Sequence, residues 1–244
     1  MVWLTKPPLG TQLDWSNPLN QGLAAFWLFN EGTGDKVYDI SGNNNTGTLT
    51  NMAFPSTTTS GWNPGRLGPA IAFDGSDDNI DIYPVVFPSS QTIFTVQAWI
   101  KTTNTAFLAN VVGGTTNTAS GFISVLNGYV QWYDGVAWRL STTLISDGIW
   151  HHLVFVFNAG TFSIYVDGKQ EYSGAAGTYT YGSAFSKIGN HVSLSRYLNG
   201  SIDEVRIWGR ALSPSEIQEI YINPYGMFLE EGICSEITCT LEIL

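Results

Sequence analysis

The chain has 244 residues, with 20 acidic and 10 basic side chains and a formal net charge of −10 at pH 7. Its 43% hydrophobic and 14% aromatic content excludes an intrinsically disordered chain, which combines low hydrophobicity with high net charge. The scarcity of Lys and Arg excludes a nucleic-acid surface, and because no apolar run approaches about 20 residues we expect no membrane insertion.

Short strands are predicted along most of the chain. Apolar residues alternate with polar ones from Leu23 to Trp208, and clusters of Gly, Asn, Asp, Ser and Thr interrupt them at intervals of roughly 8–15 residues, as in a β-sandwich. Two hairpins are expected, at Asn127-Gly128 and Asp167-Gly168, because both turn positions favour positive φ. The predicted strands are Leu23–Phe29, Ala70–Phe73, Asn79–Tyr83, Ile93–Ile100, Gly121–Leu126, Tyr129–Tyr133, Trp150–Phe157, Phe162–Val166, Ala184–Gly189 and Asn199–Trp208.

One short helix and a separate strand are predicted near the C-terminus. Ser213 is an N-cap residue followed by a proline and, three residues after the cap, Glu216, and Asn223-Pro224 ends the helix. Polar and apolar residues then alternate from Glu236 to Ile243, which predicts an amphipathic strand that needs a partner. Cys234 and Cys239 adjoin this strand and either pair with each other, link to a neighbour or stay reduced.

Five segments in this order resemble the LamG-like (laminin G, concanavalin A-like) jelly-roll domain. They are GLAAFWLFNEGTGDKVYDISGNNNTGTL, RLGPAIAFDGSDDNIDI, FTVQAWIKT, DGIWHHLVFVFNAGTFSIYVDGKQ and LNGSIDEVRIWGRALSPSEIQEIY. The resemblance implies an all-β fold, a jelly-roll sandwich of two antiparallel sheets with adjacent first and last strands and one short C-terminal helix. We therefore expect an N-terminal arm over residues 1–21, the LamG-like domain over 22–222 and a C-terminal tail with an assembly strand over 223–244.

A calcium site is predicted after the first strand. Asp39, Ser41, Asn43 and Asn45 occupy alternate positions of an oxygen-rich loop, and oxygen atoms are the ligands that Ca²⁺ prefers. The resemblance implies a structural calcium at one edge of the sandwich, and its pairing of the first and last strands would bring Asp203 beside this loop. The alternative is that Asp39 and Asn43 form Asx turns while Asp203 caps backbone amides, without a metal.

A second acidic cluster comprises Asp74, Asp77, Asp78 and Asp81, which we interpret as a tight turn between two strands and as a reserve cation site. His151 and His152 are consecutive on a strand and therefore point to opposite faces, which favours packing over chelation of one metal.

No catalytic motif stands out in the sequence. The strands lack the alternating acidic residues of glycosidases on related sandwiches, and Asp203-Glu204 is the one adjacent acidic pair with a catalytic look. Consecutive strand residues face opposite sides, so this pair is not expected to act together, and we predict that the protein is not an enzyme.

Sugar rings stack on exposed aromatic side chains, which makes several aromatic residues candidates for a glycan-binding face. For each of them the alternative is a core position that covers a sheet. The candidates are Trp132, Tyr133, Trp138, Tyr179, Tyr181 and Tyr197.

These observations favour a calcium-stabilised, non-catalytic recognition or structural module. The flanks KPPLGTQLDWSNPLNQGL and NPYGMFLE are similar to those of LamG-like proteins from phage and environmental viral genomes, which implies a virion surface protein such as a decoration, fibre or receptor-binding component. Its partners would be a glycan or cell-surface receptor, and virion proteins or a second copy through the tail. The alternatives are a carbohydrate-binding, lectin-like adhesin unconnected with a virion and, less favoured, a glycan hydrolase. No signal peptide is visible over Met1–Gly10, and we expect a virion or extracellular location.

Overall fold

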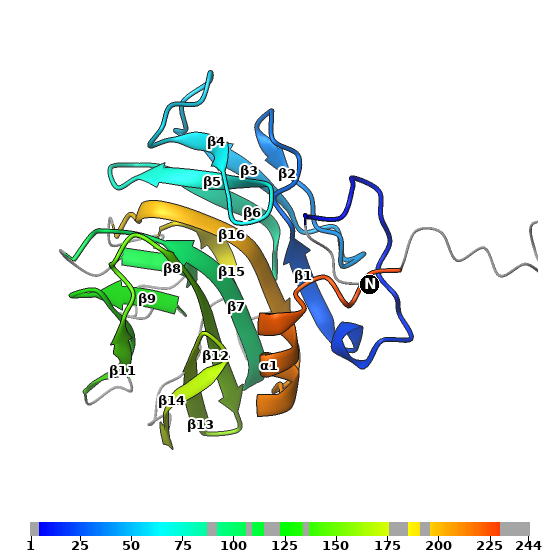
Figure 1. Ribbon diagram of the computed structural model, residues 1–244, viewed down its shortest axis with the longest axis vertical. Coiled ribbons are helices and arrows are strands. Elements are labelled where there is room, and N and C mark those ends of the chain that lie inside the picture. The colour runs from blue at the N-terminus through cyan, green and yellow to red at the C-terminus, as the bar shows by residue number, and fades with distance from the viewer. Residues whose placement is uncertain are drawn as a thin grey trace, which may run out of the picture.

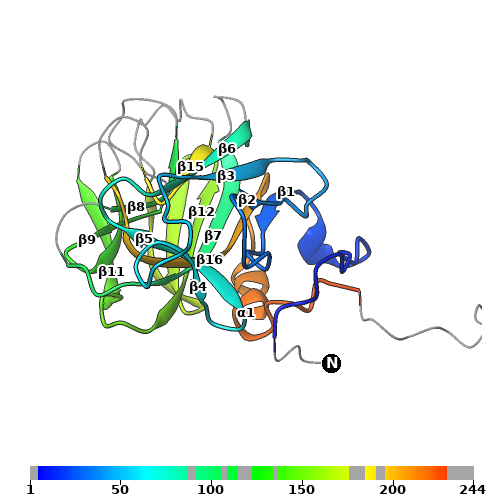
Figure 2. The ribbon, with the colours of Figure 1, turned by 90° about the horizontal axis from the view of Figure 1, so that it is seen from above.

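The computed structural model describes residues 5–86, 92–105, 109–114, 123–133, 137–175, 185–190 and 196–229. These residues form two antiparallel sheets that face each other, with a short 3-10 helix, η1 (Pro18–Asn20), and a single α-helix, α1 (Pro214–Ile222) (Figures 1 and 2). The predicted all-β jelly-roll sandwich with one short C-terminal helix is confirmed. No helix among the described residues has the length and apolar character needed to cross a membrane.

Sheet I, as we call the first sheet, contains the long central strands. Its β16 (Asn199–Trp208) lies between β7 (Ile93–Lys101) and β5 (Pro69–Asp74) over its first half. Over its second half β16 pairs with β1 (Leu23–Trp27), from Val205↔Trp27 to Trp208↔Leu23. The adjacency of the first and last predicted strands is therefore confirmed. In spatial order the sheet contains β14 (Lys169–Ala175), β13 (Thr161–Val166), β12 (Trp150–Asn158), β7 (Ile93–Lys101), β16 (Asn199–Trp208), β5 (Pro69–Asp74) and β4 (Gly61–Pro64), with β1 (Leu23–Trp27) beside β16.

Sheet II forms the other layer. Its strands are shorter, and four of them, β2, β3, β8 and β11, were not among the predicted strands, nor were β4 and β14 of sheet I. In spatial order it contains β11 (Trp138–Leu144), β10 (Tyr129–Tyr133), β9 (Ile123–Leu126), β8 (Ala109–Gly114), β15 (Phe185–Ile188), β6 (Asn79–Val86), β3 (Thr46–Thr50) and β2 (Lys36–Val37). Segments such as Gly-Trp-Asn-Pro in β4 and Thr-Gly-Thr-Leu-Thr in β3 have little apolar content of their own and become strands through pairing with a neighbour.

Both predicted hairpins and the helix form as expected. Asn127 and Gly128 have φ of 52° and 80°, and Asp167 and Gly168 have φ of 50° and 76°, the positive values that a two-residue turn requires. At α1 the Ser213 side chain accepts from the Glu216 amide, the Glu216 carboxylate accepts from the Ser213 amide, and Ile217 and Ile220 are buried.

Apolar residues form two buried clusters. The first lies between the sheets and includes Trp27, Phe73 and Phe155. The second covers the outer face of sheet I, by which we mean the face turned away from sheet II, and joins Leu13, Val154 and Trp208 to Ile217 and Tyr225. The N-terminal segment, α1 and residues 223–229 thus gather on one side of the sandwich (Figure 1).

Packing crosses both expected domain boundaries, although the boundaries themselves stay a prediction. Leu13 of the expected arm forms a β-bridge with Phe228 of the expected tail, and both side chains are buried. Residues 5–21 and 223–229 therefore pack on the body of the fold. The predicted strand Glu236–Ile243, Cys234 and Cys239 lie outside the described residues.

Candidate binding site

The loop predicted to hold calcium closes around Asp39. One Asp39 oxygen, Oδ1, accepts from the amides of Phe26 and Ser41, both at 2.9 Å. The other, Oδ2, accepts from Ser41 Oγ at 2.9 Å and from Asn45 through its amide at 3.0 Å and its Nδ2 at 2.7 Å. Asn43 Nδ2 donates to the Ala24 carbonyl at 3.0 Å. The loop thus brings Asp39, Ser41, Asn43 and Asn45 together, and Asp39 ties them to β1 as an acceptor of hydrogen bonds.

Asp203 does not join this loop, and the expected convergence with Asp39 is wrong. Trp27 of β1 pairs with Val205 on one side and forms a bridge to Asp39 on the other, so β1 lies between the two carboxylates. Asp203 Oδ1 accepts instead from Lys6 Nζ, which also donates to the Phe29 carbonyl at 2.9 Å. Burial raises the pKa of the Asp203 carboxyl, the Lys6 charge opposes that rise and the Glu204 charge adds to it.

Glu204 lies on the same face as Asp203, contrary to the alternation expected from the sequence. Its φ is 48°, and the β16–β7 register slips between Asp203 and Arg206, so a bulge turns both carboxylates to the outer face of sheet I. Glu204 accepts from Tyr225 Oη at 2.6 Å and from Arg206 Nη2 at 3.1 Å. Because both carboxylates are buried, they hold the covering segments in place and are closed to a substrate.

The second acidic cluster forms the turn between β5 and β6. Ligand oxygens of Asp74, Asp77 and Asp78 lie within 4.8 Å of one another. Asp74 Oδ1 accepts from the Ser76 amide at 2.7 Å, and Asp78 Oδ2 accepts from the Asp74 amide at 3.0 Å, as in the predicted turn. Burial, with the nearby charges of Asp74 and Asp77, raises the pKa of Asp78. Asp81 lies apart and accepts from Thr50 and Lys187.

Among the described residues, the predicted glycan-binding aromatic side chains do not gather on one face of the molecule. Trp132 is 1% exposed and packs edge-on against Phe157 at 4.8 Å between ring centroids, so its proposed place on a binding face is wrong. Trp138 is 36% exposed on the edge strand β11, and Tyr197 is half-buried. Tyr133 pairs with Trp138 through its backbone, while its side chain, Tyr179 and Tyr181 lie outside the described residues.

The two consecutive histidines differ in their surroundings. His151 is bonded to two carboxylates, through Nδ1 to Asp167 at 2.8 Å and through Nε2 to Asp147 at 3.1 Å. His152 packs against Trp99, and its ring forms no hydrogen bond with the described residues. Packing therefore explains His152, whereas His151 also pins the loop before β12 to the β13–β14 turn.

A polar groove lies on the outer face of sheet I, at the end that α1 leaves open. It has a volume of about 360 Å³, and its floor comes from paired residues of β5, β16 and β7, namely Ala72, Ser201 and Lys101. Among the described residues its lining contains hydroxyl and amide side chains and one ammonium, but no carboxylate. The lining residues are Thr58, Thr59, Asn63, Pro64, Ala72, Phe73, Lys101, Thr102, Thr103, Gly148, Asn199, Gly200 and Ser201.

Sequence reasoning missed this groove. Its floor is made of small side chains, which carry no chemical signal, and one wall depends on β4 and the loop before it, where no strand was predicted. The pairing of Ala72 with Gly61 and Ser201 is what places these small residues side by side.

Solved structures similar to this chain are β-sandwich domains. Domain 4 of AbnA, a GH43 extracellular arabinanase from Geobacillus stearothermophilus solved with arabinotriose, aligns with a TM-score of 0.60 and 22% identity over 82% of this chain and 98% of that one. The binding domain of Paraclostridial Mosquitocidal Protein 1 aligns with a TM-score of 0.62 and 19% identity over 83% of this chain and 52% of that one. Trypanosoma rangeli sialidase, solved with sialic acid, aligns with a TM-score of 0.61 and 14% identity over 86% of this chain and 34% of that one. At these identities the likeness establishes the fold.

Curated relatives match a shorter stretch. The "Sushi, von Willebrand factor type A, EGF and pentraxin domain-containing protein 1" of Rattus norvegicus is 26% identical over 106 residues, which is 38% of this chain and 3% of that protein. This chain therefore spans a very small part of the relative's length. The sequence profile of the concanavalin A-like lectin/glucanase superfamily matches residues 74–218, more than half of the chain. The chain belongs to the concanavalin A-like lectin/glucanase superfamily.

Proposed function

We propose that this domain is a non-catalytic module that recognises carbohydrate on a glycan or cell-surface receptor. The observation that carries the proposal is the open groove on sheet I, whose described lining residues offer hydroxyls, amides and one ammonium to a ligand and include no carboxylate. Its volume falls within the range of small-ligand sites. A glycosidase on such a fold needs two carboxylates beside the scissile bond, and the two carboxylates of Asp203 and Glu204 are buried away from solvent.

The similar structures support a recognition role. One of these domains was solved in complex with arabinotriose, and others are the binding domain of Paraclostridial Mosquitocidal Protein 1 and the receptor-binding domain of botulinum neurotoxin D. A sialidase is also among them, so the proposal of a non-catalytic role depends on the composition of the groove and not on the fold.

A glycan array probed with the labelled full-length chain tests this function. We expect selective binding to a set of immobilised glycans and no release of reducing sugar from those glycans in solution. Absence of binding across the array contradicts carbohydrate recognition, and turnover of any bound glycan contradicts the non-catalytic assignment.

A place on a virion surface is the finer part of this proposal. It rests on the flanking segments that resemble LamG-like proteins of phage and viral genomes, and on the alternating pattern of Glu236–Ile243, which would suit strand addition to a neighbouring sheet edge. Genes for capsid or tail proteins beside this gene would support the virion proposal. Genes for polysaccharide utilisation there would favour a free lectin.

A further inference from the structure

The groove on sheet I has a floor of small side chains set by strand register. Gly61 of β4 pairs with Ala72 of β5, Ala72 pairs with Ser201 of β16, and Ser201 pairs with Lys101 of β7. Paired residues share a face of the sheet, so three small residues and one lysine run across four strands. The small residues leave room above the sheet, and Lys101 stands at the end of this row.

The walls of the groove are held by their own hydrogen bonds. On the β4 side, Asn63 Nδ2 donates to the Thr57 carbonyl at 2.7 Å. On the β7 side, Thr102 Oγ1 donates to the Asn199 carbonyl at 2.6 Å, and the Gly148 amide donates to the Thr102 carbonyl at 3.0 Å. Both walls are thus positioned before a ligand arrives, which lowers the entropy lost on binding.

Lys101 supplies the only charge among the described residues that line the groove. It is exposed and forms no ion pair with the described residues, whereas Lys6, Arg206, Lys187 and Arg210 each bind a carboxylate. An ammonium group can only donate hydrogen bonds, and an anionic acceptor makes the strongest such bond. The Lys101 ammonium is therefore available to an anionic ligand, in a groove whose described lining residues include no carboxylate.

We propose that this groove binds a short oligosaccharide that carries a carboxylate, with the sugar hydroxyls over Ser201 and the threonine and asparagine walls and the carboxylate at Lys101. This proposal rests on the proposed carbohydrate recognition and adds its site and its ligand class. The ligand class is an oligosaccharide containing a uronic or sialic acid residue.

Isothermal titration of the full-length chain with two matched pairs of ligands tests the proposal. The pairs are trigalacturonate with its methyl ester, and sialyllactose with lactose. We expect at least one acid to bind about tenfold more tightly than its uncharged counterpart, the size of a solvent-exposed hydrogen bond to a charged group. This preference should weaken as salt is added. Equal affinities within both pairs, or no binding to either acid, overturn the proposal.

Variants locate the binding. Lys101→Gln should lower the affinity for the acid to that of the uncharged ligand, and Lys101→Glu should abolish the binding of the acid. Lys169→Gln is the matched control, since Lys169 is exposed and does not line the groove, and it should leave the affinity unchanged.

A further variant, Trp138→Ala, tests whether the ligand binds instead at the exposed aromatic side chain on the edge of sheet II. If the groove is the binding site, this variant should also leave the affinity unchanged. Glycan binding that survives Lys101→Glu but is lost in Trp138→Ala overturns the groove as the site, while carbohydrate recognition stands. An array without any bound glycan instead contradicts the proposed function itself.

Discussion

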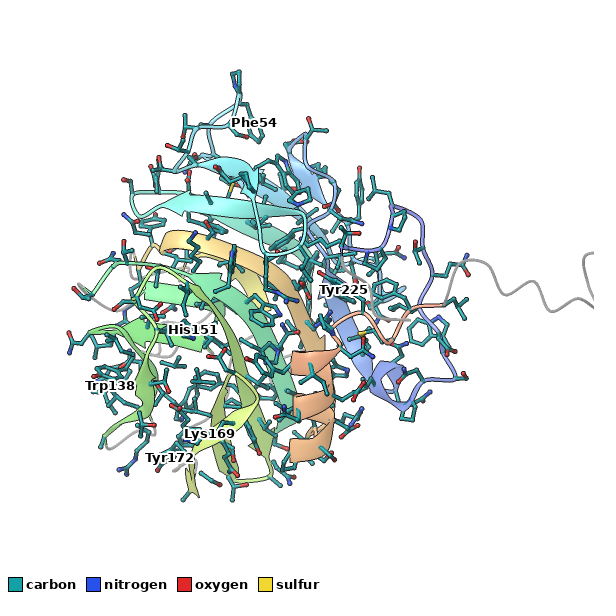
Figure 3. All side chains as sticks on the ribbon, viewed as in Figure 1. Phe54, Trp138, His151, Lys169, Tyr172 and Tyr225 are labelled. Carbon is teal, nitrogen blue, oxygen red and sulfur yellow. The ribbon has the colours of Figure 1, made fainter. Side chains whose placement is uncertain are left out.

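On the outer face of sheet I, the two halves of β16 differ in their exposure to solvent. Asp203, Glu204 and Arg206 in the second half are fully buried beneath the N-terminal segment and residues 223–228. Asn199, Gly200 and Ser201 in the first half line an open groove. Tyr225, which helps to cover the second half, lies beside β1 and above α1 in Figure 3. The difference teaches that the segments flanking the domain decide which part of this face stays free for a ligand.

The pairing of basic side chains with carboxylates also differs between the covered end and the open end of this face. At the covered end each of the basic residues Lys6 and Arg206 is paired with a carboxylate, because an unpaired charge out of water is costly. At the open end Lys101 needs no internal partner because water solvates it. The two lysines, Lys6 and Lys101, therefore allow the comparison to be tested directly.

The largest expected effect comes from removing the buried lysine. Lys6→Met should lower the free energy of unfolding by about 3–5 kcal/mol, because it leaves the Asp203 carboxylate buried without its partner. The loss should be smaller at acidic pH, where Asp203 takes up a proton. Lys101→Met, the matched control, should change stability by no more than about 0.5 kcal/mol. Urea denaturation measures both, and equal losses would contradict the division of the face.

A second prediction concerns calcium binding at the open end of this face. There Asp74, at the start of the turn between β5 and β6, pairs with Asn199 of the groove. Asp39 already accepts five hydrogen bonds, so we expect a stabilising calcium at the turn of Asp74, Asp77 and Asp78. Calcium at about ten times its dissociation constant should raise stability by about 1.4 kcal/mol, or roughly 3–6 °C in Tm.

Thermal melting with calcium or a chelator measures this effect. Asp77→Asn should abolish the rise in Tm, and Asn43→Ala in the Asp39 loop should retain it. A Tm that calcium leaves unchanged rules out both places, and loss of the effect in Asn43→Ala alone returns the site to the loop.

The smallest expected effect is the dependence of stability on pH, which concerns the consecutive histidines His151 and His152 beside the groove wall. The hydrogen bond that the His151 ring donates to Asp167, opposed by burial and aided by Asp147, raises the pKa of His151 above its usual 6.5. Stability from the charged ring is therefore complete below about pH 6.5 and is lost as the pH rises through the folded-state pKa. Burial lowers the pKa of His152 well below 6.5, so His152 stays neutral over this window.

We expect a loss of at most about 1 kcal/mol in the free energy of unfolding between about pH 6 and pH 8.5, the worth of one hydrogen bond. Urea denaturation at both pH values measures it. His151→Gln should flatten the dependence, and a variant as pH-dependent as the parent chain would assign the effect to other groups.

Local features of the fold were predictable from the sequence. Asn127-Gly128, Asp167-Gly168 and the Ser213 cap each act over a few residues, so their chemistry determines the local backbone without help from the rest of the chain. Apolar content likewise identified long strands such as Trp150–Phe157, a nearly continuous apolar run that is buried on both faces of sheet I. The candidate site was less predictable, since its residues come from separate strands.

Four residues were misplaced, for three distinct physical reasons. Trp132 was assigned to a surface because sequence alone cannot say which of two consecutive aromatics faces the core. Asp203 and Glu204 were assigned to opposite faces because a bulge, which depends on pairing with β7, cannot be seen in an alternating pattern. Lys6 was assigned to an arm because its partner, Asp203, lies 197 positions away.

The sequence by itself determined the all-β class, the two hairpins, the helix with its cap and the acidic character of the chain, because each depends on neighbouring residues or on composition. The tertiary structure alone decided which carboxylates are buried, which end of the outer face of sheet I is covered and where Ala72, Ser201 and Lys101 meet. The reason is that burial and register arise between strands far apart in the chain, where each residue's environment is set by its partner and not by its neighbours in sequence.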